Sequence, residues 1–293
     1  MNRRRGASAV QTSGPENRRR GRAAFTLIEL SIVLVIIGLV VGGVLVGRDL
    51  IKAAEARSVI SDIDKYKTAA MAFYGKYDCL PGDCPNASTF FGASANCGLG
   101  PLAPGTCNGN GNGQIENYYA AYTYPGTGAT QPAGATPSYT YHSSEDVLFW
   151  QQLSLAGMIE GSYSGFNGSS GIAYVVADNP VPFSSRISGA CYGVSYSTEY
   201  YSTGIFYPNF SATNEFFLGN PTGSQGCGIG VITPIQAQSI DSKIDDGKPD
   251  TGSVTTWEYS TPTGCVSTPG SPPYAYVTTN ITPSCALIFR AGF

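Results

Sequence analysis

The sequence is poor in the side chains that catalytic and metal sites most often use. Histidine occurs once, at His142 in a serine- and tyrosine-rich stretch, and none of the eight cysteines forms a C-x-x-C pair. Zinc sites and dithiol redox sites draw on such closely spaced ligands, so both are disfavoured. No G-x-S-x-G motif accompanies the single imidazole, which argues against a serine hydrolase. The sequence therefore predicts that the protein is not an enzyme.

Charged residues are also few, at 13% of the chain, and their signs are separated. The net charge of −3 divides into +6 on residues 1–24, which hold seven arginines and one acid, and −9 on the remainder. A nucleic-acid-binding domain would carry its positive charge on the folded part. Here the positive charge lies in a short tail without aromatic residues, so we expect no nucleic-acid partner.

Glycine and proline are abundant instead, with 37 and 19 residues, and nothing repeats with a fixed period. Aromatic residues make up 12% of the chain, which supplies enough apolar surface for a core. The glycine-rich stretches 109–113 and 226–230 lack the apolar helix and the lysine that follow a phosphate-binding loop. We therefore expect a turn-rich globular body, with these stretches as turns.

All eight cysteines follow residue 78, which indicates four disulfides formed in an oxidising compartment. They are Cys79, Cys84, Cys97, Cys107, Cys191, Cys227, Cys265 and Cys285. The sequence leaves their connectivity open. We take pairing between neighbours in sequence as the first expectation: 79 with 84, 97 with 107, 191 with 227, and 265 with 285.

Residues 25–46 form an apolar run, FTLIELSIVLVIIGLVVGGVLV, whose only charge is Glu29. As a helix it would be about 33 Å long, enough to cross a bilayer. The arginine-rich side precedes the run, which places the N-terminus in the cytoplasm and the body outside. A secretory signal peptide has a shorter apolar core and a small-residue cleavage site, so it fits poorly. An ordinary membrane anchor fits the length but leaves Glu29 unexplained, because a carboxylate in hydrocarbon is costly.

The segment AFTLIELSIV at residues 24–33 resembles the cleavage and methylation segment of type IV prepilins and type II secretion pseudopilins. The resemblance implies that prepilin peptidase cuts between Ala24 and Phe25 and that Phe25 is then N-methylated. It also implies that Glu29 pairs with the new amine of a neighbouring subunit. Glycine is commoner than alanine before the cut, but a cut after Gly21 would move Glu29 out of place. Many pilins also have a proline at the position of Val46, which this chain lacks.

Residues 48–77 contain no proline and repeat apolar side chains at intervals of three and four, which predicts one buried helix face. The face consists of Val59, Ile63, Tyr66, Ala70, Phe73 and Tyr77. Joined to the apolar run, it gives one helix of about 80 Å over residues 25–77. The resemblance implies an α+β, pilin-like fold in which this helix packs on an antiparallel sheet. We expect a cleaved leader at 1–24, the helix at 25–77 with its membrane span at 25–46, and an extracytoplasmic head at 78–293.

In the head, Pro81 and Gly82 should end the long helix, and residues 92–140 should form a long irregular loop. Residues 145–159 are the only other segment with a convincing helical pattern, which Gly157 ends or loosens. Short strands separated by turn residues predict the sheet. The expected strands are residues 172–177, 192–197, 255–259 and 286–289.

Two segments are candidates for Ca²⁺. In the first, Asn108, Asn110 and Asn112 place side-chain oxygens at alternate positions, and Gly113 stands where an EF-type loop turns sharply. Neutral asparagines in place of aspartates, and Tyr119 in place of a closing glutamate, weaken this reading. The alternative is a plain series of Asn-Gly turns.

The second candidate is an acidic cluster at residues 241–250 that resembles a K-I-D-D-G-x-P segment found late in many pilin-like proteins. Its carboxylates are Asp241, Asp245, Asp246 and Asp250. A cation could hold them together, or they could cap turns and face water. No other cofactor is indicated.

Taken together, the residues and the resemblance predict a pilin, a structural subunit that is held in the inner membrane until processed and then joins a helical filament of identical subunits. Expected partners are the prepilin peptidase, the inner-membrane assembly platform and, before assembly, the lipid bilayer. A minor pilin or a type II secretion pseudopilin, acting in the periplasm, is the alternative within the class. A membrane-anchored adhesin or enzyme that uses the helix as a tether is the alternative outside it.

Overall fold

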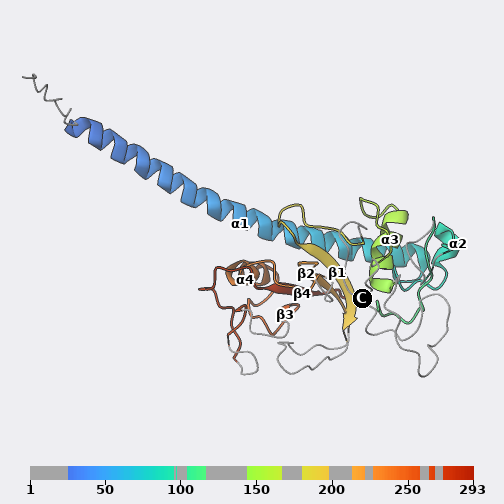
Figure 1. The fold of residues 1–293 in the computed structure, drawn as a ribbon. Coiled ribbons are helices and arrows are strands. Elements are labelled where there is room, and N and C mark those ends of the chain that lie inside the picture. Colours follow the sequence, from blue (N-terminus) through green and yellow to red (C-terminus); the bar gives the residue numbers. More distant parts are fainter. Residues whose placement is uncertain are drawn as a thin grey trace, which may run out of the picture. The chain divides into compact units, whose positions relative to one another are not determined.

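The computed structural model describes residues 26–95, 97, 104–116, 144–166, 180–197, 213–221, 227–257, 264–267 and 273–293 (Figure 1). The chain divides into two compact units, Met1–Asp49 and Leu50–Phe293. We call the second the globular unit. Helix α1, Leu27–Tyr77, contributes to both.

In the first unit, α1 is an apolar helix without a core of its own. The glycines at 38, 42, 43 and 47, which could have loosened it, all lie within the helix as assigned. Among the described residues, α1 is the one helix long and apolar enough to cross a membrane. The helix expected over residues 25–77 is therefore present from Leu27, and Phe25 lies outside the described residues.

In the globular unit, the second half of α1 buries one face. The buried side chains are Ala56, Val59, Ile63, Tyr66, Ala69, Ala70 and Phe73. Five of the six positions predicted from the periodicity are thus buried, and Tyr77 is partly buried. This spacing of three and four is what a helix needs to cover a flat apolar surface.

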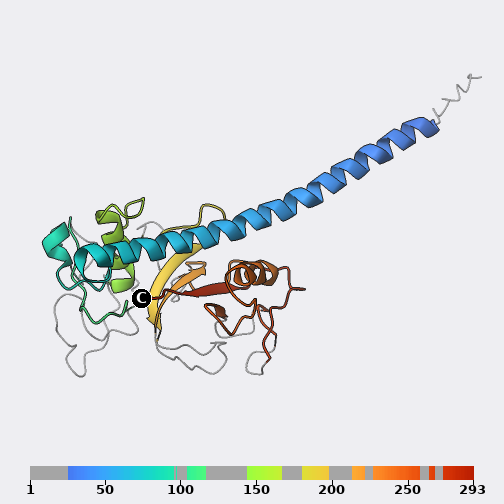
Figure 2. The ribbon, with the colours of Figure 1, turned by 180° about the vertical axis from the view of Figure 1, so that it is seen from behind.

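The surface beneath is a four-stranded antiparallel sheet of strand order β1-β2-β4-β3 (Figures 1 and 2). The strands are β1 Cys191–Ser197, β2 Thr213–Gly219, β3 Val254–Trp257 and β4 Ala286–Arg290. In register, Val194, Phe216, Phe289 and Val254 form one row across all four strands. All four are buried, as alternation along each strand places every second side chain on the same face.

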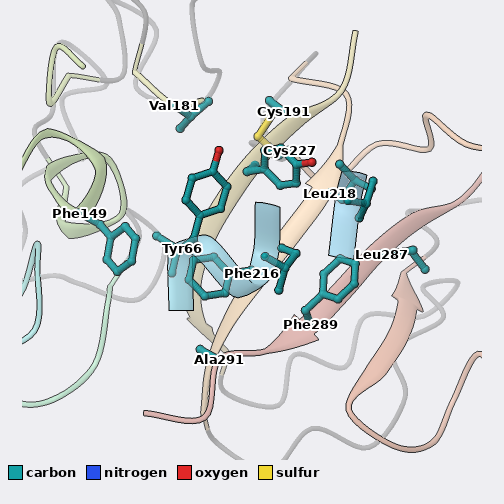
Figure 3. Packing of buried hydrophobic residues seen from close by; sticks show 14 of the residues in the cluster. Tyr66, Phe149, Val181, Cys191, Phe216, Leu218, Cys227, Leu287, Phe289 and Ala291 are labelled. Atoms are coloured by element: carbon teal, nitrogen blue, oxygen red, sulfur yellow. A yellow bond between two sulfur atoms is a disulfide. The ribbon is translucent and has the colours of Figure 1, made fainter. Parts of the chain in front are cut away.

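Tyr66 of α1 joins the helix to this core (Figure 3). Its ring makes edge contacts with Trp150, at 4.9 Å between centroids, and with Tyr192, at 5.3 Å. Phe216 of the sheet lies 6.4 Å away. Such aromatic pairs contribute about 0.5–1.5 kcal/mol each beyond the apolar area they bury. The packing of Tyr66 therefore stabilises the α+β, pilin-like architecture that the sequence predicted.

The described ranges contain three further helices, which border the core: α2 Ala87–Phe91, α3 Glu145–Leu155 and α4 Pro234–Ile244. α3 is shorter than the predicted 145–159, because Gly157 has a φ of +70° and ends the helical conformation. α4 was not predicted, so the expectation of a single further helix was wrong. Its start is a capping box between Thr233 and Gln236, with Pro234 in the first turn.

Three of the predicted strands correspond to β1, β3 and β4, whereas β2 was not predicted. The strand expected at 172–177 lies outside the described residues, as does most of the loop expected at 92–140. Four disulfides join the cysteines in sequence-neighbour pairs: Cys79–Cys84, Cys97–Cys107, Cys191–Cys227 and Cys265–Cys285. The first closes the turn that follows α1. The third ties the start of β1 to the segment after β2.

Candidate functional site

The start of α1 is a capping box built from Thr26 and Glu29. The Glu29 carboxylate accepts hydrogen bonds from the backbone N–H of Thr26, at 2.7 Å, and from its hydroxyl, at 2.9 Å. In return, the backbone N–H of Glu29 donates to the Thr26 hydroxyl at 3.3 Å. This reciprocal pair occupies donors that the first turn of a helix leaves free. Glu29 thus has a partner within its own chain.

The apolar side chains that follow are exposed around the helix. Every large aliphatic residue of α1 from Leu27 to Ile51 is 50% exposed or more. Between Glu29 and Arg48 the helix has no charged residue. Exposed apolar patches of such extent mark surfaces that lipid or another protein covers. The first half of α1 therefore needs an apolar environment, and the described residues around it do not supply one.

Ala24 and Phe25, the residues expected to flank the cleavage, lie outside the described residues. Of the predicted processing and assembly residues, the structure therefore describes Glu29 alone. The sequence reasoning missed Thr26, although T-x-x-E before an apolar run is itself a signal for the start of a helix.

In the globular unit, two polar contacts fasten α1 to the elements beneath it. The Tyr192 hydroxyl on β1 donates a 2.7 Å hydrogen bond to Asp62 of α1. The Gln236 amide on α4 donates at 2.9 Å to Glu55 of α1. Burial, followed by the nearby Asp62 carboxylate, raises the pKa of the Tyr192 hydroxyl, so it remains a donor at physiological pH.

The loop 108–116, the first calcium candidate, is wrapped around two buried carboxylates. Asp83 accepts hydrogen bonds from the backbone N–H groups of Gly111, Asn112 and Gly113 at 2.6–3.1 Å. Glu145, at the start of α3, accepts from the N–H groups of Asn110 at 2.9 Å and Glu116 at 3.0 Å. The backbone of this loop therefore presents donors to two acidic side chains.

The pKa values of both carboxyl groups are raised. Burial is the main cause for Glu145, whose pKa rises to about 8, and the neighbouring carboxylates of Asp83 and Glu116 add to it. Burial also raises the pKa of Asp83, against the lowering effect of its three backbone donors. The two acids lie on segments 62 positions apart in sequence, so no local motif revealed them.

The asparagine oxygens of this loop are used within the protein. Asn108 accepts from the backbone N–H of Ser88 at 2.8 Å. Asn110 accepts from the N–H of Asn112, and Asn112 accepts from that of Gln114. The last two contacts each join residues two positions apart and are asparagine-capped turns, the alternative that the sequence left open. An inward cradle of N–H donors does not suit a cation, so the geometry gives the calcium hypothesis no support here.

In the second calcium candidate, too, the carboxylates accept hydrogen bonds from N–H and O–H groups of the protein. Asp241 accepts from the Tyr276 hydroxyl at 2.8 Å and from the N–H of Gly247 at 3.1 Å. Asp245 accepts from the N–H groups of Ser253 and Val254.

The remaining two acids of that candidate lie in the turns before β3. Asp246 accepts from the N–H of Lys248 and the hydroxyl of Thr251, and Asp250 lies in the next turn. No cluster of three or more acidic, histidine or cysteine side chains that could hold a metal ion occurs within the described ranges. Calcium binding at either segment stays a prediction of the sequence alone.

Comparison with known proteins adds one match. The family described as prokaryotic N-terminal methylation motif matches residues 19–45. The curated proteins and the solved structures give no match. The match covers the expected cleavage position, Glu29 and most of the apolar run. The chain therefore carries the type IV prepilin and pseudopilin signature at its N-terminus, and its architecture is α+β and pilin-like.

Proposed function

We propose that the protein is a structural subunit of a type IV pilus-like filament, processed by prepilin peptidase and assembled through the first half of α1. The observation that carries the proposal is the methylation motif at residues 19–45, placed on a helix whose apolar side chains are exposed all round. The motif implies processing and assembly of this kind. The exposed helix supplies the surface on which assembly would occur.

The precursor sits in the inner membrane, with residues 1–24 in the cytoplasm. Cleavage between Ala24 and Phe25 removes the arginine-rich leader and creates an amine at Phe25, which is then methylated. A carboxylate inside a membrane is costly unless it has a partner. In the filament, the new amine of one copy offsets the charge of Glu29 in the next, which sets the register between them.

The filament and the tether differ in whether they require Glu29. A helix that serves only as an anchor needs length and apolarity, and it gains nothing from a carboxylate. A filament subunit needs the negative charge itself. The capping box gives Glu29 a separate role that does not depend on its charge. Its side-chain oxygen accepts the hydrogen bond from the Thr26 N–H, and a glutamine at position 29 could still do so.

Three variants of the full-length chain separate these roles. We expect both Glu29→Val and Glu29→Gln to remain in the membrane and to be lost from filaments sheared off the cells. Ser31→Val is the matched control, because it also removes a polar group, one bonded only to the carbonyl oxygen of Ile28. We expect it to assemble.

Normal assembly of Glu29→Gln would refute charge pairing and leave Glu29 only its capping role. Absence of the wild-type chain from any filament would refute the proposal and favour the tether. For an assembled chain, immunogold labelling distinguishes the members of the class. Labelling along surface fibres indicates a major pilin, labelling at fibre tips a minor pilin, and labelling confined to the periplasm a pseudopilin.

A further inference from the structure

The globular unit has an apolar pocket of about 120 Å³ between the second half of α1 and α4. The lining comes from both helices and from two isoleucines of the segments that pack beside them. The lining residues are Lys52, Glu55, Ala56, Ile187, Ile232, Ile235, Gln236, Ser239 and Ile240. All belong to the globular unit.

The pocket has a buried floor and an open mouth. Ala56, Ile232 and Ile240 are almost fully buried and form its floor, whereas Ile235 on the first turn of α4 is 49% exposed. The 2.9 Å hydrogen bond from Gln236 to Glu55 holds α4 against α1 at this point. The pocket is therefore present before any ligand arrives.

We propose that this pocket receives an aliphatic side chain from the apolar half of α1, residues 27–46, of a second copy of the chain. The proposal rests on the proposed function and specifies where on the globular unit a neighbouring helix is held. A cavity of about 150 Å³ with aliphatic walls accommodates benzene. A pocket of about 120 Å³ thus accommodates one leucine, isoleucine or valine side chain, in the manner of a knob in a hole.

The second copy supplies such side chains in excess. In residues 27–46 the large aliphatic side chains lie on every side of the helix and are all half exposed or more. A bundle of like helices covers only part of such a surface, because each helix has just a few neighbours at 8–10 Å. A pocket on the globular unit provides further apolar cover for the same helix.

The pocket also continues the exposed apolar surface of α1. Leu50 and Ile51, at 66% and 61% exposed, lead directly to Lys52 at the edge of the pocket. Along the helix, the pocket residues 52–56 follow the apolar half 27–46 by at least 6 positions (from 46 to 52) and at most 29 (from 27 to 56). At 1.5 Å per residue, a parallel copy shifted along the helix axis by about 9 to about 44 Å therefore brings part of its apolar half beside the pocket.

Lys52 and Glu55 favour a protein occupant over a lipid chain. Both line the pocket, and their polar head groups would have to enter hydrocarbon if the pocket were immersed in the bilayer. Beside an assembled helix, the long stem of Lys52 can lie along apolar surface while its ammonium group reaches water.

Photo-crosslinking of the full-length chain in cells tests the proposal. Benzoylphenylalanine replaces Ile235, and separately Ile281, an isoleucine that is 87% exposed and lies outside the pocket. Filaments are sheared off after irradiation, and the crosslinked peptides are identified by mass spectrometry. We expect position 235 to crosslink to residues 27–46 of a second copy and position 281 not to do so.

Crosslinks from position 235 to lipid, to another protein or to a different part of the second copy would overturn the proposal. A complete lack of crosslinks in assembled filaments would also overturn it. Both failures leave filaments present, whereas failure of the proposed function leaves none in the sheared fraction of the wild type. The two failures are therefore distinguishable.

A pair of substitutions gives an independent measure. Ile235→Asp places a charge at the mouth of the pocket, and Ile281→Asp makes the same change outside it. We expect Ile235→Asp to lower incorporation into filaments roughly tenfold or more relative to Ile281→Asp, with both chains equally resistant to proteolysis of the globular unit. Equal incorporation of the two variants would contradict the proposal.

Discussion

Glu145, at the start of α3, accepts a 2.9 Å hydrogen bond from the backbone N–H of Asn110, 35 positions earlier. This contact closes the loop 108–116 over a buried acid that is surrounded by other acids. Asp83 and Glu116 are the neighbouring carboxylates that raise its pKa further. The backbone N–H groups of the loop thus face Glu145, a carboxyl group that is costly to ionise. Because the ionisation of Glu145 depends on pH, the stability of the fold should depend on pH as well.

We expect the chain to lose stability as the pH rises. Glu145 has a pKa of about 8 in the folded chain against an ordinary value of 4.5, so the folded chain retains a proton that the unfolded chain has released. The free energy of unfolding then falls between about pH 4.5 and pH 8, by at most about 1.4 kcal/mol per pH unit for this group. Asp241, with a pKa raised to about 7 by burial, acts in the same direction.

Thermal unfolding of the full-length chain in detergent, followed from pH 5 to pH 8.5, measures this slope. Glu145→Gln should make the slope shallower, because the titrating group is gone. Glu160→Gln, at an exposed position, is the control and should leave the slope as it is. An unchanged slope in Glu145→Gln would contradict the assignment of the pH dependence to this acid.

Tyr192→Phe tests the contact between β1 and α1. It removes the hydroxyl that donates to Asp62 at 2.7 Å and keeps the ring that packs on Tyr66. A hydrogen bond to a charged group contributes about 1.5–3 kcal/mol, so we expect a loss of that size in the free energy of unfolding by urea. Tyr163→Phe removes a hydroxyl that bonds a backbone carbonyl three residues away and should cost less. Equal losses would mean that the Asp62 contact is energetically unimportant.

Two glycines with similar positive φ values differ in how crowded their surroundings are. Gly82 and Gly92 have φ values of +85° and +84°. A Cβ at Gly82 would meet the carbonyl oxygen of Glu145, whereas a Cβ at Gly92 would have no atom within 4 Å. Gly92 combines this φ with a ψ of 146°, close to a region populated almost only by glycine, so Gly92→Ala should cost about 1–3 kcal/mol from strain alone. Gly82→Ala should cost at least about 2 kcal/mol more, because α3 must move away.

Denaturant midpoints of these two alanine variants, measured side by side, give the comparison. Equal midpoints would show that the turn after α1 is not packed closely against α3.

Calcium should leave the stability of the chain unchanged. The carboxylates at 241–246 and the asparagine oxygens at 108–112 already accept hydrogen bonds from the protein. A ligand that binds only the folded chain raises its Tm, so melting the protein with calcium and with a chelator is a direct check. Identical Tm values are expected. A higher Tm with calcium would mean that these segments rearrange to form a cation site.

Prediction from sequence succeeded where the signal is local. The apolar run and the spacing from Val59 to Phe73 each lie within one continuous stretch, and together they predicted helix α1 and its buried face. The motif around Glu29 is equally local, and the methylation-motif family matches it. α3 was predicted because an apolar pattern follows Glu145, although nothing nearby indicated that this acid is buried. The pairs of neighbouring cysteines likewise required no knowledge of the fold.

The missed elements depend on contacts between distant segments. β2 has the sequence TNEFFLG and is buried between β1 and β4. Its polar residues Asn214 and Glu215 interrupt the apolar pattern by which a buried strand is predicted. α4 is an exception, because its capping box at Thr233 is a local signal that the prediction from sequence did not include. Only its last residues, from Asp241, were interpreted, as the start of an acidic cluster. The association of Asp83 with Glu145 depends on the fold as a whole and could not be predicted locally.

Mass spectrometry of the N-terminal peptide tests processing and assembly most directly. The peptide is taken from the membrane fraction and from the sheared surface fraction of cells that produce the full-length chain. We expect the sheared fraction to contain a chain that begins at N-methylated Phe25, because cleavage after Ala24 and entry into a filament would then both have occurred. A chain that retains residues 1–24 and occurs only in membranes would contradict this account and leave α1 as a simple anchor.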